Sequence, residues 1–199
     1  MNWWLKVRAA QSLAGATALT VVLGILLGDT ELPIPILTGQ AGVFLAGHLL
    51  TVLPAVVLMY GQERTDHRIE VTAARPINQW NACLGLATAL AVTTATGLVH
   101  LTLGSDMAVV CGRNIGGYIG IAMILSSVTG PRISAFLTTA LPLVLAHTGW
   151  KPSGEPEIWA WLLHEEDSVI AMVTTMFVLV AGCASLALRR NPMRLKAFR

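Results

Sequence analysis

Long runs of uncharged, mostly apolar residues alternate with short charged stretches along the whole chain. A helix needs about 20 such residues to cross a bilayer, and six runs reach or approach that length. They cover residues 9–28, 35–60, 81–103, 107–129, 133–149 and 168–188, and the fourth run is interrupted by one charge, Arg113. The pattern predicts an all-α, polytopic membrane protein in which six transmembrane helices form a single domain over residues 1–199.

Basic residues fall almost entirely on one side of this six-helix layout. Eleven of the thirteen Lys and Arg lie on the side that carries both termini, and only Lys151 and Arg113 lie on the other. Eight of the eleven acidic residues lie on that other side. Because cytoplasmic loops of membrane proteins are enriched in Lys and Arg, we expect both termini to be cytoplasmic.

The residues before the first span combine bulky apolar and basic side chains. Trp3, Trp4 and Leu5 stand beside Lys6 and Arg8, which is typical of a short amphipathic helix lying in the inner membrane interface. The apolar run that follows exceeds the roughly 7–15 residues of a cleavable signal core. We therefore expect an uncleaved first helix.

The composition agrees with a lipid environment. Hydrophobic residues make up 54% of the chain, charged residues 12%, and the mean hydropathy is +0.66, whereas a soluble domain is about 25% charged. This disfavours a soluble enzyme, a nucleic-acid-binding protein and a secreted disulfide-rich domain. The three cysteines form no Cys-x-x-Cys pair, so neither zinc nor a disulfide framework is predicted.

Small residues recur at a spacing of four along several spans. Gly112, Gly116 and Gly120 are one such series, and Gly24 and Gly28 are another. Small residues at this spacing let helices approach closely in membranes. They predict tight helix packing, within the chain or with a second copy.

The inner connection, residues 61–80, is long enough to have a function of its own. Thr65 is a candidate N-cap for a helix over Asp66–Ala74, which Pro76 would end. The residues that would share one face of that helix are Arg64, Arg68, Val71 and Arg75. A short charged cytoplasmic helix suits docking onto another protein, while a solvated loop whose arginines only fix the topology is the alternative.

The outer connection, residues 150–167, contains Pro156 at a possible first helical position. The apolar residues after it predict an amphipathic helix at the outer membrane surface, and they are Ile158, Trp159, Leu162 and Leu163. The consecutive residues His164 to Asp167 would point in different directions on a helix. No metal site is therefore expected there.

Polar side chains inside the spans are costly in a membrane and are candidates for a transport pathway. They are His48, Arg113, Asn114 and Tyr118. The alternatives are that His48 packs against a neighbouring helix and that Arg113 extends to the outer lipid headgroups. The chain has no phosphate-binding loop and no Gly-x-Ser-x-Gly or His-Glu-x-x-His motif, so we expect neither ATP hydrolysis nor another enzymatic activity.

Two stretches resemble the membrane subunits of ATP-binding-cassette (ABC) exporters of the type-2 permease class, in their small actinobacterial-like form. They are ERTDHRIEVTAARPINQWN at Glu63–Asn81 and RNIGGYIGIAMILSSVTGPRISAFLTTALPL at Arg113–Leu143. The similar features are Arg-Pro before the third span, Arg-Asn at the start of the fourth and Gly-x-Arg before the fifth. Here these are Arg75-Pro76, Arg113-Asn114 and Gly130-Pro131-Arg132.

The resemblance implies a permease in a bacterial cell (inner) membrane that works with a second copy or a sister permease and with two cytoplasmic ATP-binding subunits. Those subunits would bind ATP and Mg, so this chain would hold no cofactor. The cargo would be hydrophobic or amphiphilic: a peptide, a natural product or a lipid. The coupling helix that contacts the ATPase would carry Glu63, Arg64, Asp66, Arg68, Glu70 and Arg75. The outer connection would match the short re-entrant helices, with Trp159, Trp161 and Leu162.

Two other interpretations remain open. A substrate-capture subunit of an energy-coupling-factor importer also has six helices, but it would not need a charged helix after the second span. A membrane-embedded enzyme using His48, His100 or Asp106 lacks a convergent acid–base or nucleophile motif.

Overall fold

The computed structural model describes residues 2–27, 30–32, 44–64 and 77–189. The regular secondary structure of this part of the chain is helical apart from one antiparallel pair of two-residue strands, which confirms the expected all-α class. The helices are α1 (Asn2–Val7), α2 (Ala10–Leu27), α3 (Ala46–Leu50), α4 (Leu53–Glu63), α6 (Ile77–Leu103), α7 (Asp106–Thr129), α8 (Pro131–Thr148), the 3-10 helix η1 (Trp161–Leu163) and α9 (Val169–Ala187). The strands are β1 (Glu31–Leu32) and β2 (Phe44–Leu45).

Four helices in the described part of the chain are long and apolar enough to cross a membrane: α2, α6, α7 and α9. Each closely matches an expected span, and α8 covers residues 133–148 of the fifth expected span, 133–149. A helix also forms at the N-terminus, where α1 is separated from α2 by a turn at Ala9 with φ 52°. Four apolar helices of this length indicate a membrane protein.

The second expected span, residues 35–60, is not one continuous helix. Its described part consists of β2, α3 and α4, and the helices are interrupted between Leu50 and Leu53. Pro54 explains the interruption, because a proline ring clashes with the carbonyl four residues earlier in a continuous helix, and that carbonyl belongs to Leu50. The Thr51 hydroxyl donates to His48 O at 3.0 Å and holds the turn between the two helices.

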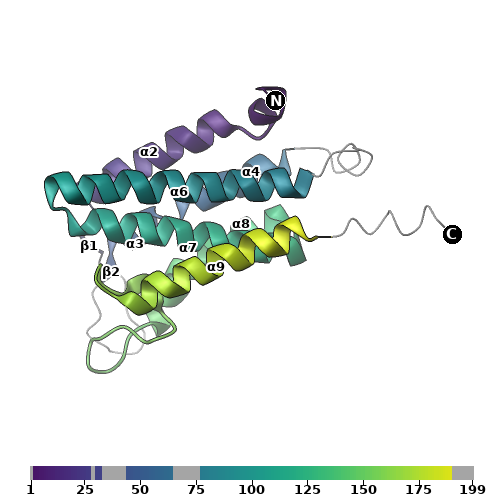
Figure 1. Cartoon of the computed structure of the whole chain (residues 1–199). Helices are drawn as coiled ribbons and strands as arrows, with labels where there is room; N and C mark the ends of the chain where they lie inside the picture. Colours follow the sequence, from purple (N-terminus) through teal and green to yellow (C-terminus); the bar gives the residue numbers. More distant parts are fainter. Residues whose placement is uncertain (1, 28–29, 33–43, 65–76, 190–199) are drawn as a thin grey trace.

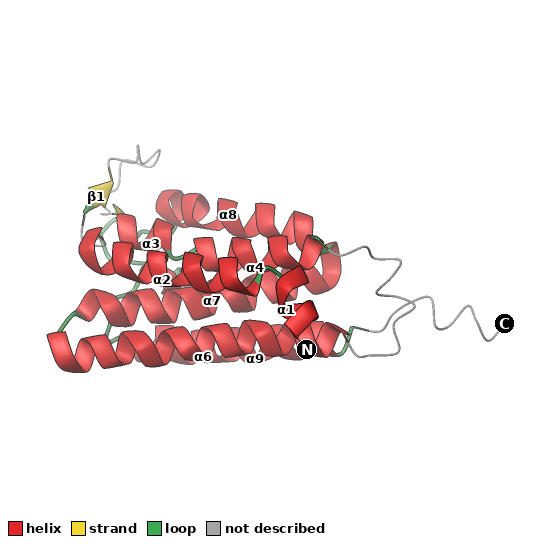
Figure 2. Ribbon diagram, turned by 90° about the horizontal axis from the view of Figure 1, so that it is seen from above, coloured by secondary structure: helices red, strands yellow, loops and turns green. Residues whose placement is uncertain are grey.

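Helix α7 lies at the centre of the bundle. It packs against α2, α4, α6, α8 and α9, it lies between other helices in both views (Figures 1 and 2), and every residue from Val110 to Gly120 is buried. A Cβ atom at Gly120 would lie only 2.8 Å from the backbone N of Leu179 in α9. The expected tight packing at Gly120 is therefore found between α7 and α9 of one chain.

One end of the bundle gathers α1, the start of α2, the end of α4, the start of α6 and the ends of α7 and α9 (Figure 1). We call it the basic end, because the described basic residues there are Lys6, Arg8, Arg64, Arg132 and Arg189. The opposite, acidic end carries the turn from α6 to α7 and the connection from α8 to α9. The described acidic residues there are Glu31, Asp106, Glu155, Glu157, Glu165, Glu166 and Asp167. The described helices therefore separate charge as the sequence pattern predicts.

Candidate functional site

The buried polar residues of α7 form the most polar part of the bundle interior. Arg113, Asn114 and Tyr118 are 5%, 0% and 0% exposed. Arg113 and Asn114 are neighbours in the half of α7 near the acidic end, and Tyr118 follows Asn114 by one helical turn. Since buried polar groups need hydrogen-bond partners, the contacts of these side chains show what they hold in place.

Arg113 binds the connection from α8 to α9, residues 150–167, which we call the outer segment. Its Nη1 donates to Glu165 O at 2.7 Å, its Nη2 donates to His164 O, and its Nε donates to Asn114 Oδ1 at 3.2 Å. The alternative in which Arg113 extends to lipid headgroups does not fit this geometry, because the outer segment folds back and brings backbone carbonyls to the guanidinium.

Asn114 and Gly117 complete the contact. Asn114 Nδ2 donates to Leu162 O at 2.8 Å, and a Cβ atom at Gly117 would overlap the ring of Trp161. Trp161 and Leu162 are buried, whereas Trp159 is 51% exposed. The structure thus brings Arg113 and Asn114 together with two of the three outer-segment residues singled out from the sequence, and Trp159 faces outward.

The outer segment does not contain the expected amphipathic α-helix. Its residues form turns and the short helix η1. Pro156 pairs with Trp150 in a β-bridge, and Glu157 N donates to Gly149 O at 2.8 Å. Because these contacts close a small loop around Gly154, which has φ 84°, Pro156 is not the first residue of a helix.

His164 ties the outer segment to the start of α9. Its Nδ1 lies 3.1 Å from Ser168 Oγ, and its Nε2 lies 3.1 Å from Glu157 O. Ser168 is the N-cap of α9 and accepts from Ala171 N at 3.3 Å. Among the described residues, no three His, Cys, Asp or Glu side chains lie close enough together to hold a metal ion.

Tyr118 and His48 meet deeper in the bundle. The Tyr118 hydroxyl donates to His48 O at 3.4 Å, and both residues are buried. The four polar residues expected along a pathway therefore fall into two groups. Arg113 and Asn114 hold the outer segment, whereas Tyr118 contacts α3 at His48, in the turn before the interruption between α3 and α4.

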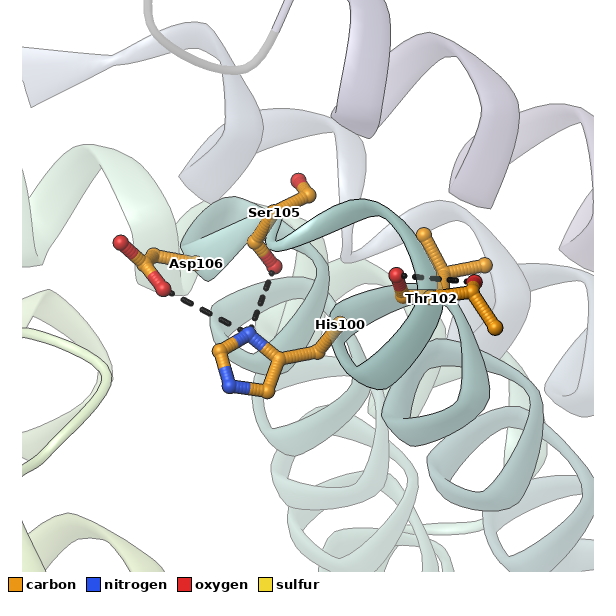
Figure 3. Close-up of polar contacts among 5 residues, drawn as sticks. His100, Thr102, Ser105 and Asp106 are labelled. Atoms are coloured by element: carbon orange, nitrogen blue, oxygen red, sulfur yellow. Dashed lines mark hydrogen bonds and ion pairs between the residues drawn. The ribbon is translucent and has the colours of Figure 1, made fainter.

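His100 belongs to the turn between α6 and α7 at the acidic end. Its Nδ1 lies 3.4 Å from Asp106 Oδ1 and 3.2 Å from Ser105 O (Figure 3). Thr102, drawn beside it, donates to Leu98 O within α6 at 2.8 Å. These contacts close the turn, and the histidine and the carboxylate are both partly exposed.

The basic end carries the other expected site. Glu63 ends α4 and Arg64 is its C-cap, both exposed, with the Arg64 guanidinium carbon 6.0 Å from the centre of the Tyr60 ring. The rest of the expected coupling helix, including Asp66, Arg68, Glu70 and Arg75, lies outside the described residues.

The described residues on either side of this connection are fastened to other helices. Arg8, just before α2, donates from Nη1 to Gln62 O at 2.8 Å in α4. At the start of α6, Asn78 Nδ2 donates to Arg189 O at 3.0 Å, and Arg189 Nη1 donates to Ser126 O of α7 at 3.0 Å. We call Arg8, Asn78 and Arg189 the anchor residues.

Sequence reasoning missed the anchor residues and Gly117. Arg8, Asn78 and Arg189 all stand at the ends of apolar runs, where a polar residue is ordinary, so their partners could not be inferred. Gly117 lies outside the series Gly112, Gly116 and Gly120 at a spacing of four. Its neighbour Gly116 belongs to that series, which predicts close packing on a different face of α7.

Comparison of the chain with protein-family models, with curated proteins and with solved structures finds no match.

Proposed function

We propose that the chain is the permease subunit of an ABC exporter and that ATP-binding subunits dock on residues 61–80. The observation that carries the proposal is the fastening of both ends of this connection to other helices. Arg8 links the end of α4 to the start of α2, and Asn78 with Arg189 links the start of α6 to α9 and α7. A displacement of the connection would therefore reach most of the bundle.

The membrane layout in this proposal has six crossings, in which α3 and α4 together form the second. The charge separation supports an orientation with the basic end in the cytoplasm, which puts both termini and residues 61–80 on the cytoplasmic side of a bacterial cell membrane. The outward faces of the helices are apolar enough for lipid contact, as exposed Leu98, Phe136 and Phe177 illustrate.

In this assembly two membrane halves, either two copies or this chain and a sister permease, bind two ATPases. ATP and Mg are held by the ATPases, and this chain catalyses no reaction. A hydrophobic or amphiphilic cargo passes along the seam between the halves. Closure of the ATPases on ATP changes the populations of inward-open and outward-open states, and the anchor residues carry that change to α2, α7 and α9.

The test is co-purification with candidate ATP-binding subunits from the operon of this chain. The variant carries Arg64→Glu, Arg68→Glu and Arg75→Glu, and Arg132→Glu is the matched control, because Arg132 is exposed at the same end on a different turn. We expect the ATPases to co-purify with the wild type and the control but not with the triple variant. Equal recovery with all three, or no ATPase bound to the wild type, would contradict the proposal and favour the importer subunit or the enzyme.

A further inference from the structure

The outer segment has two separate sets of hydrogen bonds, one internal and one to α7. The internal set joins Glu157 to Gly149 and, through the His164 ring, joins Glu157 to Ser168. Lys151 N also donates to Glu155 O at 2.8 Å. None of these bonds involves α7, so the segment can keep its shape without it.

The set that reaches α7 comes from two adjacent residues. Arg113 and Asn114 donate to the backbone carbonyls of Leu162, His164 and Glu165. The acceptors are main-chain atoms from one short stretch, so releasing two side chains of α7 breaks all of these hydrogen bonds at once and leaves that stretch held to α7 by the apolar packing of Trp161 and Leu162 at Gly117.

The charge of Arg113 is balanced in an unusual way. Among the described residues no carboxylate lies within ion-pair distance, 4.0 Å, of its guanidinium. Buried charges are ordinarily paired with an opposite charge, whereas the hydrogen-bond partners of Arg113 are neutral carbonyls and one amide oxygen, and the carboxylate of Glu166 in the outer segment acts on it only at longer range. Releasing the contact therefore breaks no direct ion pair, although it moves the Glu166 carboxylate away from Arg113, and the carbonyls lie near the acidic end, where water can replace the donors.

We propose that Arg113 and Asn114 are positioning residues that latch the outer segment onto α7, and that the segment lifts from α7 as a unit when the latch opens. Within the proposed function, on which this role rests, the latched segment closes the outer side of the pathway. Lifting it would uncover the polar face of α7 at Arg113 and Asn114 for cargo leaving the protein.

The experiment measures how fast a buried position in the outer segment becomes accessible. Leu163 is buried, and Leu163→Cys is introduced together with Cys83→Ala and Cys183→Ala. A water-soluble maleimide is then added to the protein in lipid nanodiscs. Cys111 is kept, because it is buried in α7 beside Gly24 and becomes labelled only when the bundle itself loosens.

We expect slow labelling at position 163 in this background and labelling on the order of tenfold faster after Arg113→Met or Asn114→Leu, with Cys111 still protected. The labelling rate of the Arg113→Lys variant should lie between these two rates, because lysine keeps the positive charge but lacks the several N–H donors of the planar guanidinium. Asp167→Asn is the control, since it removes an exposed charge from the same segment, and its labelling rate should be unchanged.

Three results would overturn the latch: equal rates in all variants, labelling of the background as fast as that of Arg113→Met, or acceleration only together with labelling of Cys111 in both latch variants. No ATPase takes part in this measurement. The latch and the docking of ATPases therefore fail or succeed separately.

Discussion

The approach of α7 to α9 depends on two glycines that leave no room for a side chain. A Cβ atom at Gly182 would lie 2.5 Å from Gly120 O, and one at Gly120 would lie 2.8 Å from the backbone N of Leu179. Backbone atoms cannot move aside as a flexible side chain can. In a membrane, where lipid is as apolar as the helix surface, such close packing is a main source of helix association.

We predict that Gly182→Ala destabilises the protein by about 1–3 kcal/mol, the usual cost of overpacking. Gly15→Ala is the matched control, because a Cβ atom at Gly15 would meet nothing within 4 Å. Denaturation of both purified variants in mixed micelles measures the difference. Equal stability of the two variants would show that α7 and α9 are not in backbone contact.

Helix α9 has one face that packs against the bundle and an opposite face of exposed apolar side chains, as expected for a helix that contacts lipid. The inward face holds buried Ala171, Thr175, Leu179, Gly182 and Leu186. The outward face holds exposed Val169, Val173, Phe177 and Val180. Because both faces are apolar in composition, the sequence alone does not say which one contacts α7. The small residues Thr175 and Gly182 on one face are the only local hint.

A lysine on the outward face of α9 should cost more at the middle of the helix than at its end. Phe177 lies near the middle and Val169 is the first residue, and both are 72% exposed. We predict that Phe177→Lys lowers membrane integration by about 2–3 kcal/mol, as charged groups at a span centre do. Val169→Lys should have little effect, since lysine there reaches the interface. Equal integration of the two variants would argue against a spanning α9.

The ends of most helices could be predicted because apolar runs in this chain stop at charged, Gly or Pro residues. The end of α6 before Gly104 is an example, and α8 starts at Pro131, two residues before the expected start at Ile133. The interruption at Pro54 was not predicted, because the expected second span rested on the length and hydropathy of residues 35–60 as a whole. The contacts of Arg113 could not be predicted, since its acceptors are backbone carbonyls 51 and 52 residues away, and backbone carbonyls have no sequence signal.

At the scale of the whole molecule, charge separation and helix direction agree. The described helices alternate between the two ends of the bundle, and α1 and the last turn of α9 lie at the same, basic end (Figure 1). Arg113 is an exception to the separation, because it lies near the acidic end, where it is buried against the outer segment. The remaining described basic residue at the acidic end is Lys151, which lies 3.6 Å from Glu155.

Reporter fusions test the orientation that we infer from these charges. A fluorescent protein that folds only in the cytoplasm should be bright when it is fused after Arg199. Alkaline phosphatase, which is active only outside, should be active when it is fused after Ser153 in the outer segment. The opposite pattern would place the basic end outside and would remove residues 61–80 from the reach of any cytoplasmic ATPase.

The central claim is that ATP hydrolysis drives this chain through residues 61–80, and the rate of ATP hydrolysis by the reconstituted complex tests it most directly. The complex is assembled in nanodiscs at saturating ATPase concentration with the wild type, with Arg132→Glu, or with the triple variant Arg64→Glu, Arg68→Glu and Arg75→Glu. We predict that the wild type and Arg132→Glu raise the rate above that of the ATPases alone, and that the triple variant does not. A rate that is unaffected by the triple substitution, or by the presence of this chain, would contradict the account.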